Sequence, residues 1–178
     1  MKNLYAIIGG PGRGKSTTLK ELGKLGFEVV EEAAEQIKRE QLKSPNPILP
    51  ETRFLGFQRL VITRQVSLEA RVNGGLAFTD RGRPDNMAYC RLKGVAVPYD
   101  MQKSVDEGVY KGVFSLSRLP MYVQTDIRPE SESEADAIHC AIGSAYQERG
   151  YAIVQVPLLQ ALKRAKWIVE HIQGENHV

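Results

Sequence analysis

The sequence has little of several features that mark specialised classes of protein. Cysteine occurs only twice in 178 residues, at Cys90 and Cys140, with no Cys-x-x-Cys pair. This excludes a disulfide scaffold and a cysteine-based zinc site, and it indicates a reducing compartment. No run of eighteen apolar residues exists, so no membrane span is expected, and the apolar stretch Leu4–Ile8 is too short for an export signal. We therefore expect a cytoplasmic protein that does not use a membrane.

The sequence also has only a small excess of charge of one sign. Twenty-four basic and 21 acidic residues give a formal net charge of +3, without a basic stripe, so no DNA partner is expected. The hydrophobic fraction of 42% is enough to bury a core, which excludes a disordered chain. The length favours one domain over residues 1–178.

Short apolar runs alternate with stretches of helical periodicity along the chain. Strands are predicted over Asn3–Ile8, Phe27–Val30, Leu76–Thr79, Gly112–Leu116 and Tyr151–Val156. Helices are predicted over Lys15–Leu25, Ala33–Leu42, Glu51–Val72, Pro84–Leu92, Asp100–Gly108, Ser131–Arg149 and Leu159–Ile172. Strands that alternate with helices form parallel sheets through right-handed crossovers. The predicted class is therefore α/β, a three-layer α/β/α arrangement with a five-stranded parallel sheet.

The strongest motif lies between the first strand and the first helix. Residues 9–16 read GGPGRGKS and match G-x-x-x-x-G-K-[ST] in full. Glycines let backbone N–H groups turn inward around a phosphate, and the helix N-terminus that follows favours an anion. Lys15 is expected to reach the β- and γ-phosphates of ATP, and the Ser16 hydroxyl to bind Mg²⁺. The predicted nucleotide-binding residues are Gly10, Pro11, Gly12, Arg13, Gly14, Lys15, Ser16 and Thr17.

Charged residues follow the second and third predicted strands. In parallel sheets, ligands collect beyond the carboxyl ends of the strands. Asp80 ends an apolar run and is expected to hold Mg²⁺, with a helix N-cap as its alternative role. Rotary or remodelling ATPases typically carry a second acid at the next position to activate water, but this chain has Arg81 there. Glu32 is a candidate to orient an acceptor hydroxyl or take its proton, and a solvated first-turn acid is the alternative.

A lid is expected over residues of about 117–135. Arg118 and Arg128 bracket a stretch that is neither clearly strand nor helix. Phosphoryl transfer needs positive charge over the transferring group, which an arginine on a mobile segment supplies. Arg128 is the candidate for this role. The three histidines, His139, His171 and His177, lack ligand spacing and are expected to be structural or solvated.

Five sequence blocks carry a resemblance to a known family: GGPGRGKST, VVEEAAEQI, FTDRGRPDNMAYCRLKG, DIRPES and YQERGYAIVQVP. They resemble the small AAA-domain family of ATPases and kinases. That family is related to the ribosylnicotinamide kinase domain and, more distantly, to the deoxynucleoside and thymidylate kinases. The resemblance extends over nearly the whole chain and, with the phosphate motif, implies a three-layer α/β/α P-loop NTPase with a nucleoside-kinase-like fold. It also implies that Glu32 is a base, that Asp80 and Arg81 form an acidic–basic pair, and that Arg128 is a lid arginine.

The combined motifs favour a small-molecule kinase that transfers the γ-phosphoryl group of Mg-ATP to a hydroxyl or phosphate. The expected acceptor is nucleoside- or nucleotide-like and enters near the proline-rich loop 44–50. The expected catalytic residues are Lys15, Glu32, Asp80, Arg81 and Arg128. The alternative is an ATP- or GTP-binding switch or slow NTPase that acts through a protein partner. A homodimer also stays open.

Overall fold

The computed structural model describes residues 3–119 and 131–175. Its strands are β1 (Leu4–Ile8), β2 (Glu28–Val30), β3 (Ala77–Asp80), β4 (Gly112–Leu116) and β5 (Ile153–Val156). Its helices are α1 (Lys15–Lys24), α2 (Ala33–Gln41), α3 (Phe54–Ala70), α4 (Arg83–Leu92), α5 (Tyr99–Asp106), α6 (Glu132–Gln147) and α7 (Ala161–Glu175).

The strands form one parallel sheet in the order β2-β3-β1-β4-β5. β1 lies in the middle, and all five of its residues are buried, which explains why its sequence is continuously apolar rather than alternating. The register pairs Ile7 of β1 with Asp80 of β3. The loop after β1 and the turn after β3 therefore leave the sheet side by side. The predicted α/β class with five parallel strands is confirmed.

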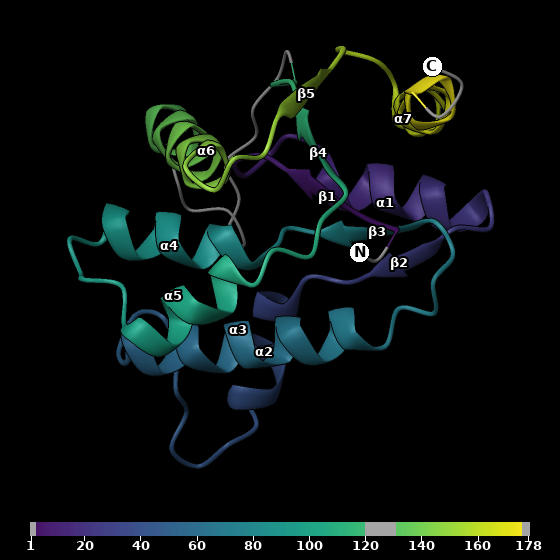
Figure 1. The fold of residues 1–178 in the computed structure, drawn as a ribbon. Helices are drawn as coiled ribbons and strands as arrows, with labels where there is room; N and C mark the ends of the chain where they lie inside the picture. Colours follow the sequence, from purple (N-terminus) through teal and green to yellow (C-terminus); the bar gives the residue numbers. More distant parts are fainter. Residues whose placement is uncertain (1–2, 120–130, 176–178) are drawn as a thin grey trace.

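Helices cover both faces of the sheet, as Figure 1 shows. Alternate residues of β1 point to opposite faces. Leu4 and Ile8 pack in one cluster with Tyr146 of α6 and Ala88 of α4. Tyr5 and Ile7 pack in a second cluster on the other face, with Leu19 and Leu22 of α1 and Ala165 and Ile168 of α7. The protein therefore has three layers, and a separate hydrophobic core fills the space on each face of the central sheet.

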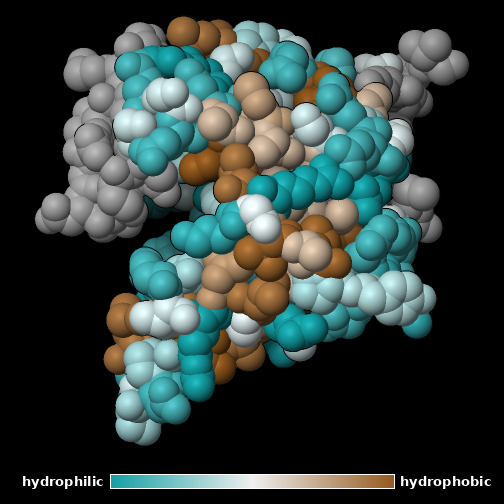
Figure 2. Space-filling model, turned by 90° about the vertical axis from the view of Figure 1, so that its left-hand side faces the viewer, coloured by the Kyte–Doolittle hydropathy of each residue, from teal (hydrophilic) through white to brown (hydrophobic). Residues whose placement is uncertain are grey.

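Two further helices extend the layer formed by α3, α4 and α6. α2 lies against α3 through Ile37 and Phe57, and α5 packs on α3 and α4 through Met101. In Figure 1, α2 and α3 lie in the lower part of the molecule. Figure 2 shows a hollow in the surface above this lower part. No helix in residues 3–119 and 131–175 is both long enough and apolar enough to cross a bilayer.

The predicted start of the third helix at Glu51 is wrong, because α3 begins at Phe54. The backbone N–H groups of Thr52 and Arg53 both donate to the carbonyl oxygen of Leu49. This hydrogen-bonded turn uses the residues that periodicity alone assigns to a helix. The proline-rich loop therefore extends three residues further than expected.

The Gly82→Ala substitution tests the packing between the third strand and α6. A β-carbon at Gly82 would lie 2.5 Å from the hydroxyl oxygens of Tyr110 and Tyr146. Both tyrosines are buried, so we expect the free energy of unfolding to fall by about 1–3 kcal/mol. Urea denaturation measures this value.

The matched control is Gly143→Ala in the middle of α6. A β-carbon there would lie 4.0 Å from Ile153 Cδ1, an ordinary contact. Alanine favours a helix over glycine by about 1 kcal/mol, so this variant should be unchanged or more stable. Equal stability of the two variants would contradict the packing described here.

Candidate active site

The loop between β1 and α1 closes around the side chain of Lys15. Its backbone enters the left-handed region at Gly12 (φ +73°) and Gly14 (φ +79°), where glycine is favoured. Lys15 Nζ donates to the carbonyl oxygens of Gly9 at 2.7 Å and Gly10 at 3.0 Å. Burial, together with the nearby Arg81 charge, lowers the pKa of Lys15 to about 8. The loop thus holds a buried cation at a helix N-terminus, an arrangement that suits a phosphate group.

Helix α6 forms one wall of this phosphate loop. A β-carbon at Gly10 would overlap the carbonyl oxygen of Ala135, so only glycine allows the helix to approach this closely. The Gly10 N–H donates to His139 Nδ1 at 3.4 Å, and an Arg13 nitrogen lies 2.7 Å from Asp136 Oδ1. Burial, with the Arg13 charge, lowers the pKa of His139 to about 4. At neutral pH this imidazole is therefore uncharged and able to accept.

Asp136 also joins the phosphate loop to the end of β4. Its Oδ2 accepts from Arg118 Nη1 at 2.9 Å, and Arg118 forms a second ion pair with Glu132. Arg118 therefore lies beside α6, next to the phosphate loop.

Asp80 ends β3 and contacts the first turn of α1. Ser16 Oγ donates to Asp80 Oδ2 at 3.1 Å. The other carboxylate oxygen, Oδ1, is buried without a hydrogen-bond partner. Burial raises the pKa of Asp80 to about 6, although the Lys15 ammonium opposes this.

This pair of oxygen ligands fits a magnesium ion. Mg²⁺ prefers hydroxyl and carboxylate oxygens and keeps several waters or phosphate oxygens in its octahedral shell. The unpartnered oxygen of Asp80 is an acceptor that a cation would satisfy. No group of three or more His, Cys, Asp or Glu side chains forms a metal cage in the described part of the chain. Ser16 and Asp80 would therefore hold the ion with help from a nucleotide and water.

Arg81 is held at the neighbouring position in an unusual conformation. It is the only non-glycine residue with a positive φ, +68°, among residues 3–119 and 131–175. Its Nε lies 2.9 Å from Glu32 Oε1, and its Nη1 donates to the Tyr89 hydroxyl at 2.6 Å. The guanidinium also lies over the Tyr89 ring and 3.7 Å from Asp85 Oδ1. The predicted residues Glu32 and Arg81 are thus brought together as an ion pair.

Buried polar groups support the turn that carries Arg81. Thr79 Oγ1 donates to the Arg81 carbonyl at 2.9 Å and accepts from Gln65 of α3. Asp85 Oδ2 accepts from the Gly82 N–H at 3.2 Å and from the Tyr146 hydroxyl at 2.8 Å. The threonine that interrupts the apolar strand therefore helps to fix a strained backbone.

A second buried network lies next to this turn. Arg83 Nε donates to Glu69 Oε2 at 2.7 Å, and the Tyr110 hydroxyl bonds the other Glu69 oxygen. The Arg83 N–H in turn donates to the Tyr110 hydroxyl at 2.8 Å. Since breaking a buried ion pair leaves an uncompensated charge, these contacts fix the start of α4 against α3.

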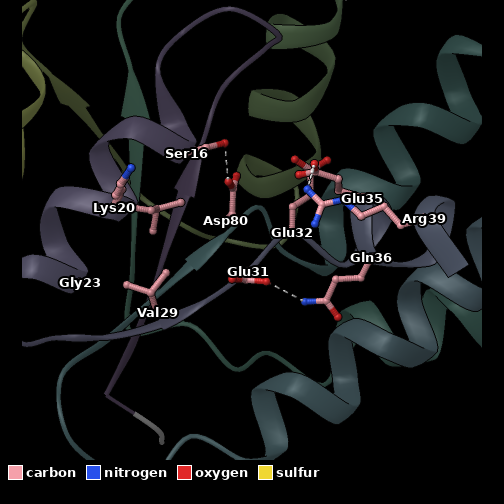
Figure 3. Close-up of a pocket in the computed structure, with 11 residues that line it drawn as sticks. Ser16, Lys20, Gly23, Val29, Glu31, Glu32, Glu35, Gln36, Arg39 and Asp80 are labelled. Atoms are coloured by element: carbon pink, nitrogen blue, oxygen red, sulfur yellow. Dashed lines mark hydrogen bonds and ion pairs between the residues drawn. The ribbon is translucent and has the colours of Figure 1, made fainter. Parts of the chain in front are cut away.

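A cavity of about 410 Å³ opens beside Ser16 and Asp80, between α1 and α2. Figure 3 shows Glu31, Glu32 and Asp80 along its lining, with Ser16 directed toward Asp80. The cavity extends from Ser16 and Asp80 to Glu32, the residue that forms the ion pair with Arg81. This volume is in the range of small-molecule sites.

Some predicted site residues lie outside the described part of the chain, and other residues of the site were not predicted from the sequence. Arg128, and residues 120–130 of the predicted lid, lie outside the described residues. Sequence reasoning missed Asp85, Tyr89 and Arg164, and it treated His139 as structural or solvated. Asp85 and Tyr89 stand four residues apart in α4, a spacing that places them on one side of the helix. Arg164 interrupts the apolar stripe of α7, which is a signal that the sequence carries.

A comparison with protein families assigns the chain to a known family. Residues 4–163 match a family described as an AAA domain. The chain belongs to this AAA-domain family. The resemblance expected from the sequence blocks is thereby confirmed. No curated protein matches the sequence of this AAA-domain protein at a significant level.

Solved structures share the fold of this AAA-domain protein at low identity. Shikimate kinase from Acinetobacter baumannii, in complex with shikimate, is 17% identical with a TM-score of 0.60, covering 98% of this chain and 94% of that one. Deoxyadenosine kinase from M. mycoides with bound dATP is 17% identical with a TM-score of 0.61, covering 96% and 98%.

The NadR protein in complex with NAD and AMP-PNP is 16% identical with a TM-score of 0.72. The alignment covers 99% of this chain but 50% of that one, so the chain spans about half of NadR. These likenesses show that the AAA-domain protein has the fold of P-loop kinases.

The pKa of Asp80 predicts a pH dependence of stability. The native chain binds more protons than the unfolded chain between about pH 4 and pH 6, because burial raises this pKa from 3.8 to about 6. The free energy of unfolding should therefore fall as the pH rises through this window, by up to about 3 kcal/mol from this group. Asp80→Asn should lack this contribution.

Urea denaturation at several pH values, with EDTA present, measures the difference between wild type and Asp80→Asn. The variant should gain on the wild type as the pH rises from about 4 to 6. A difference that stays constant with pH would contradict the burial of this carboxylate.

Proposed function

We propose that the protein is an ATP-dependent small-molecule kinase. The observation that carries the proposal is the junction of three features at one edge of the sheet. Lys15 lies in the phosphate loop, Ser16 and Asp80 form an oxygen pair 3.1 Å apart, and Arg81 pairs with Glu32 beside the cavity. Phosphoryl transfer is catalysed mainly by positioning and by positive charge, and these residues supply both.

The phosphate loop is the proposed nucleotide side of the site. Residues 10–17 would hold the polyphosphate of ATP, with Lys15 on the β- and γ-phosphates. Mg²⁺, when bound, would neutralise charge on the phosphate oxygens. Ser16 and Asp80 would hold that ion, because their oxygens already lie together.

The cavity beside α2 is the proposed acceptor side. Glu32 lines it and, through Oε1, also pairs with Arg81. A carboxylate in this position would orient the acceptor hydroxyl and accept its proton. Arg81, fixed by Tyr89 and Asp85, would place positive charge near the transferred group. A nucleoside- or nucleotide-like acceptor fits the available volume.

The second candidate is an ATP- or GTP-binding switch or slow NTPase that acts through a partner protein. The contact of α6 with the phosphate loop favours it, since Asp136 and His139 would report the state of the loop. A panel of nucleosides, nucleotides, vitamins and sugars with Mg-ATP separates the two functions. Release of ADP stimulated by one acceptor supports a kinase, whereas a slow rate indifferent to all acceptors supports the switch.

Lys15→Met should abolish most nucleotide binding. It removes a charge that lies inside the loop, so we expect the Kd for Mg-ATP to rise by about tenfold or more. Calorimetric titration measures this change. Lys24→Met is the matched control, because Lys24 is an exposed residue of α1 paired with Glu21. Equal effects of the two substitutions would remove the phosphate loop from the proposal.

Arg128→Ala should slow phosphoryl transfer at least as much as Glu32→Gln. A transition-state arginine contributes about 10³- to 10⁵-fold, whereas a general base contributes about 10²- to 10⁴-fold. Turnover with the acceptor found by the panel measures both. Arg59→Ala is the control, since Arg59 is exposed and pairs with Asp100. Near-normal turnover of Arg128→Ala would exclude a lid arginine.

A further inference from the structure

Arg164 connects the last helix to the back of the phosphate loop. It lies in the first turn of α7 and is 2% exposed. Its Nη1 donates to the Arg13 carbonyl at 2.9 Å and to Thr18 Oγ1 at 3.4 Å. Its Nη2 donates to the Leu159 carbonyl at 3.0 Å. A single side chain therefore joins the loop, α1 and the connection from β5 to α7.

The charge of Arg164 has no acidic partner in residues 3–119 and 131–175. Its Nε is buried without a hydrogen-bond acceptor, and its other contacts are to carbonyl and hydroxyl oxygens. The other buried arginines differ, because Arg83 pairs with Glu69 and Arg13 with Asp136. A buried charge without a counter-charge is costly. Burial accordingly lowers the pKa of Arg164.

An apolar residue would suit this position better if packing were its only role. The neighbours of Arg164 on the same stripe, Ala165 and Ile168, are fully buried in the core with α1. The hydrogen bonds of Arg164 explain a donor at this position but not a full positive charge. A bound anion would supply the missing counter-charge.

The location of the guanidinium indicates what neutralises it. A β-carbon at Gly14 would lie 2.9 Å from Arg164 Nη1, so the group sits directly behind the residue that caps α1. Gly14 is also the last residue before Lys15 in the phosphate motif. An anion held by the loop would therefore meet Lys15 directly and would interact with the Arg164 charge across the loop backbone.

We propose that Arg164 is a nucleotide-positioning residue whose charge is compensated by the polyphosphate bound in the loop. Its hydrogen bonds to Arg13 and Leu159 fix the loop, and its charge favours ligands with more phosphates. The inference rests on the proposed function and adds a second buried cation to Lys15. It concerns nucleotide binding only and does not depend on the acceptor.

The test is calorimetric titration of ATP, ADP and AMP into wild type, Arg164→Gln and Arg164→Lys. EDTA is present so that magnesium does not mask the phosphate charge. Arg164→Gln should weaken ATP binding by about tenfold or more, and AMP binding by at most about threefold. Arg164→Lys keeps the charge and should bind ATP within about threefold of wild type.

Two controls separate this role from general effects. Lys163→Gln removes the same charge from an exposed neighbour on α7 and should bind ATP within about twofold of wild type, because exposed charge is screened. Thermal unfolding without nucleotide confirms that each variant is folded. Should Arg164→Gln not fold, Arg164→Met suits an apolar environment and carries the same expectation.

Unchanged ATP affinity of the neutral variant would overturn the inference. So would equal losses for ATP and AMP in both Arg164→Gln and Arg164→Lys, since a purely structural residue would act without regard to phosphate number. If wild type binds no nucleotide, the proposed function itself fails. If wild type binds ATP and the Arg164 variants match it, only this inference fails.

Discussion

The ion pair between Arg81 and Glu32 joins the turn after β3 to the start of α2. β2 is an edge strand of three residues and pairs only with β3, so its own hydrogen bonds hold α2 weakly to the sheet. The ion pair adds a side-chain connection at the point where the cavity opens. The backbone of Arg81 takes a left-handed conformation. Thr79 and Asp85 hydrogen-bond the backbone of this turn, and Tyr146 in turn holds Asp85.

Some buried charges at this edge have an ion-pair partner, whereas Lys15, Asp80 and Arg164 form no ion pair among the described residues and lie at the proposed ligand sites. Arg83 and Arg13 pair with carboxylates. Asp80 keeps one oxygen unpartnered, which fits a cation. Arg164 keeps its charge uncompensated by the described residues, which fits an anion. Asp80 contacts Ser16 and Arg164 contacts Thr18. Because residues two apart in a helix point in roughly opposite directions, the two groups lie on different sides of the start of α1.

The fold could be predicted from the sequence because its signals are local. Continuous apolar runs such as Leu4–Ile8 identify buried parallel strands, and the glycine-rich motif places the loop between a strand and a helix. The rule that ligands collect at the carboxyl ends of strands correctly brought Asp80, Arg81 and Glu32 to one edge. The start of α3 was missed because the turn at Leu49 depends on backbone geometry that periodicity does not encode.

The contacts of the site were harder to predict because they join distant parts of the chain. Asp136 and Arg13 are separated by more than a hundred positions, as are Arg164 and the phosphate loop. Only the packing of α6 and α7 on the sheet brings them together. His139 was expected to be structural or solvated, since nothing in its neighbourhood in the sequence indicates that Gly10 will donate to it.

The candidate site lies between elements that pack in different hydrophobic cores. α1 packs with α7 in one core, whereas α4 and α6, which flank the Arg81 turn, pack in the other. A molecule that touched both would add to the sheet, the Ser16–Asp80 hydrogen bond and the contacts of α6 with the phosphate loop, which already connect the two cores. Its binding free energy would then enter the cooperativity of unfolding, and amide protection would increase in both layers together rather than near the ligand alone.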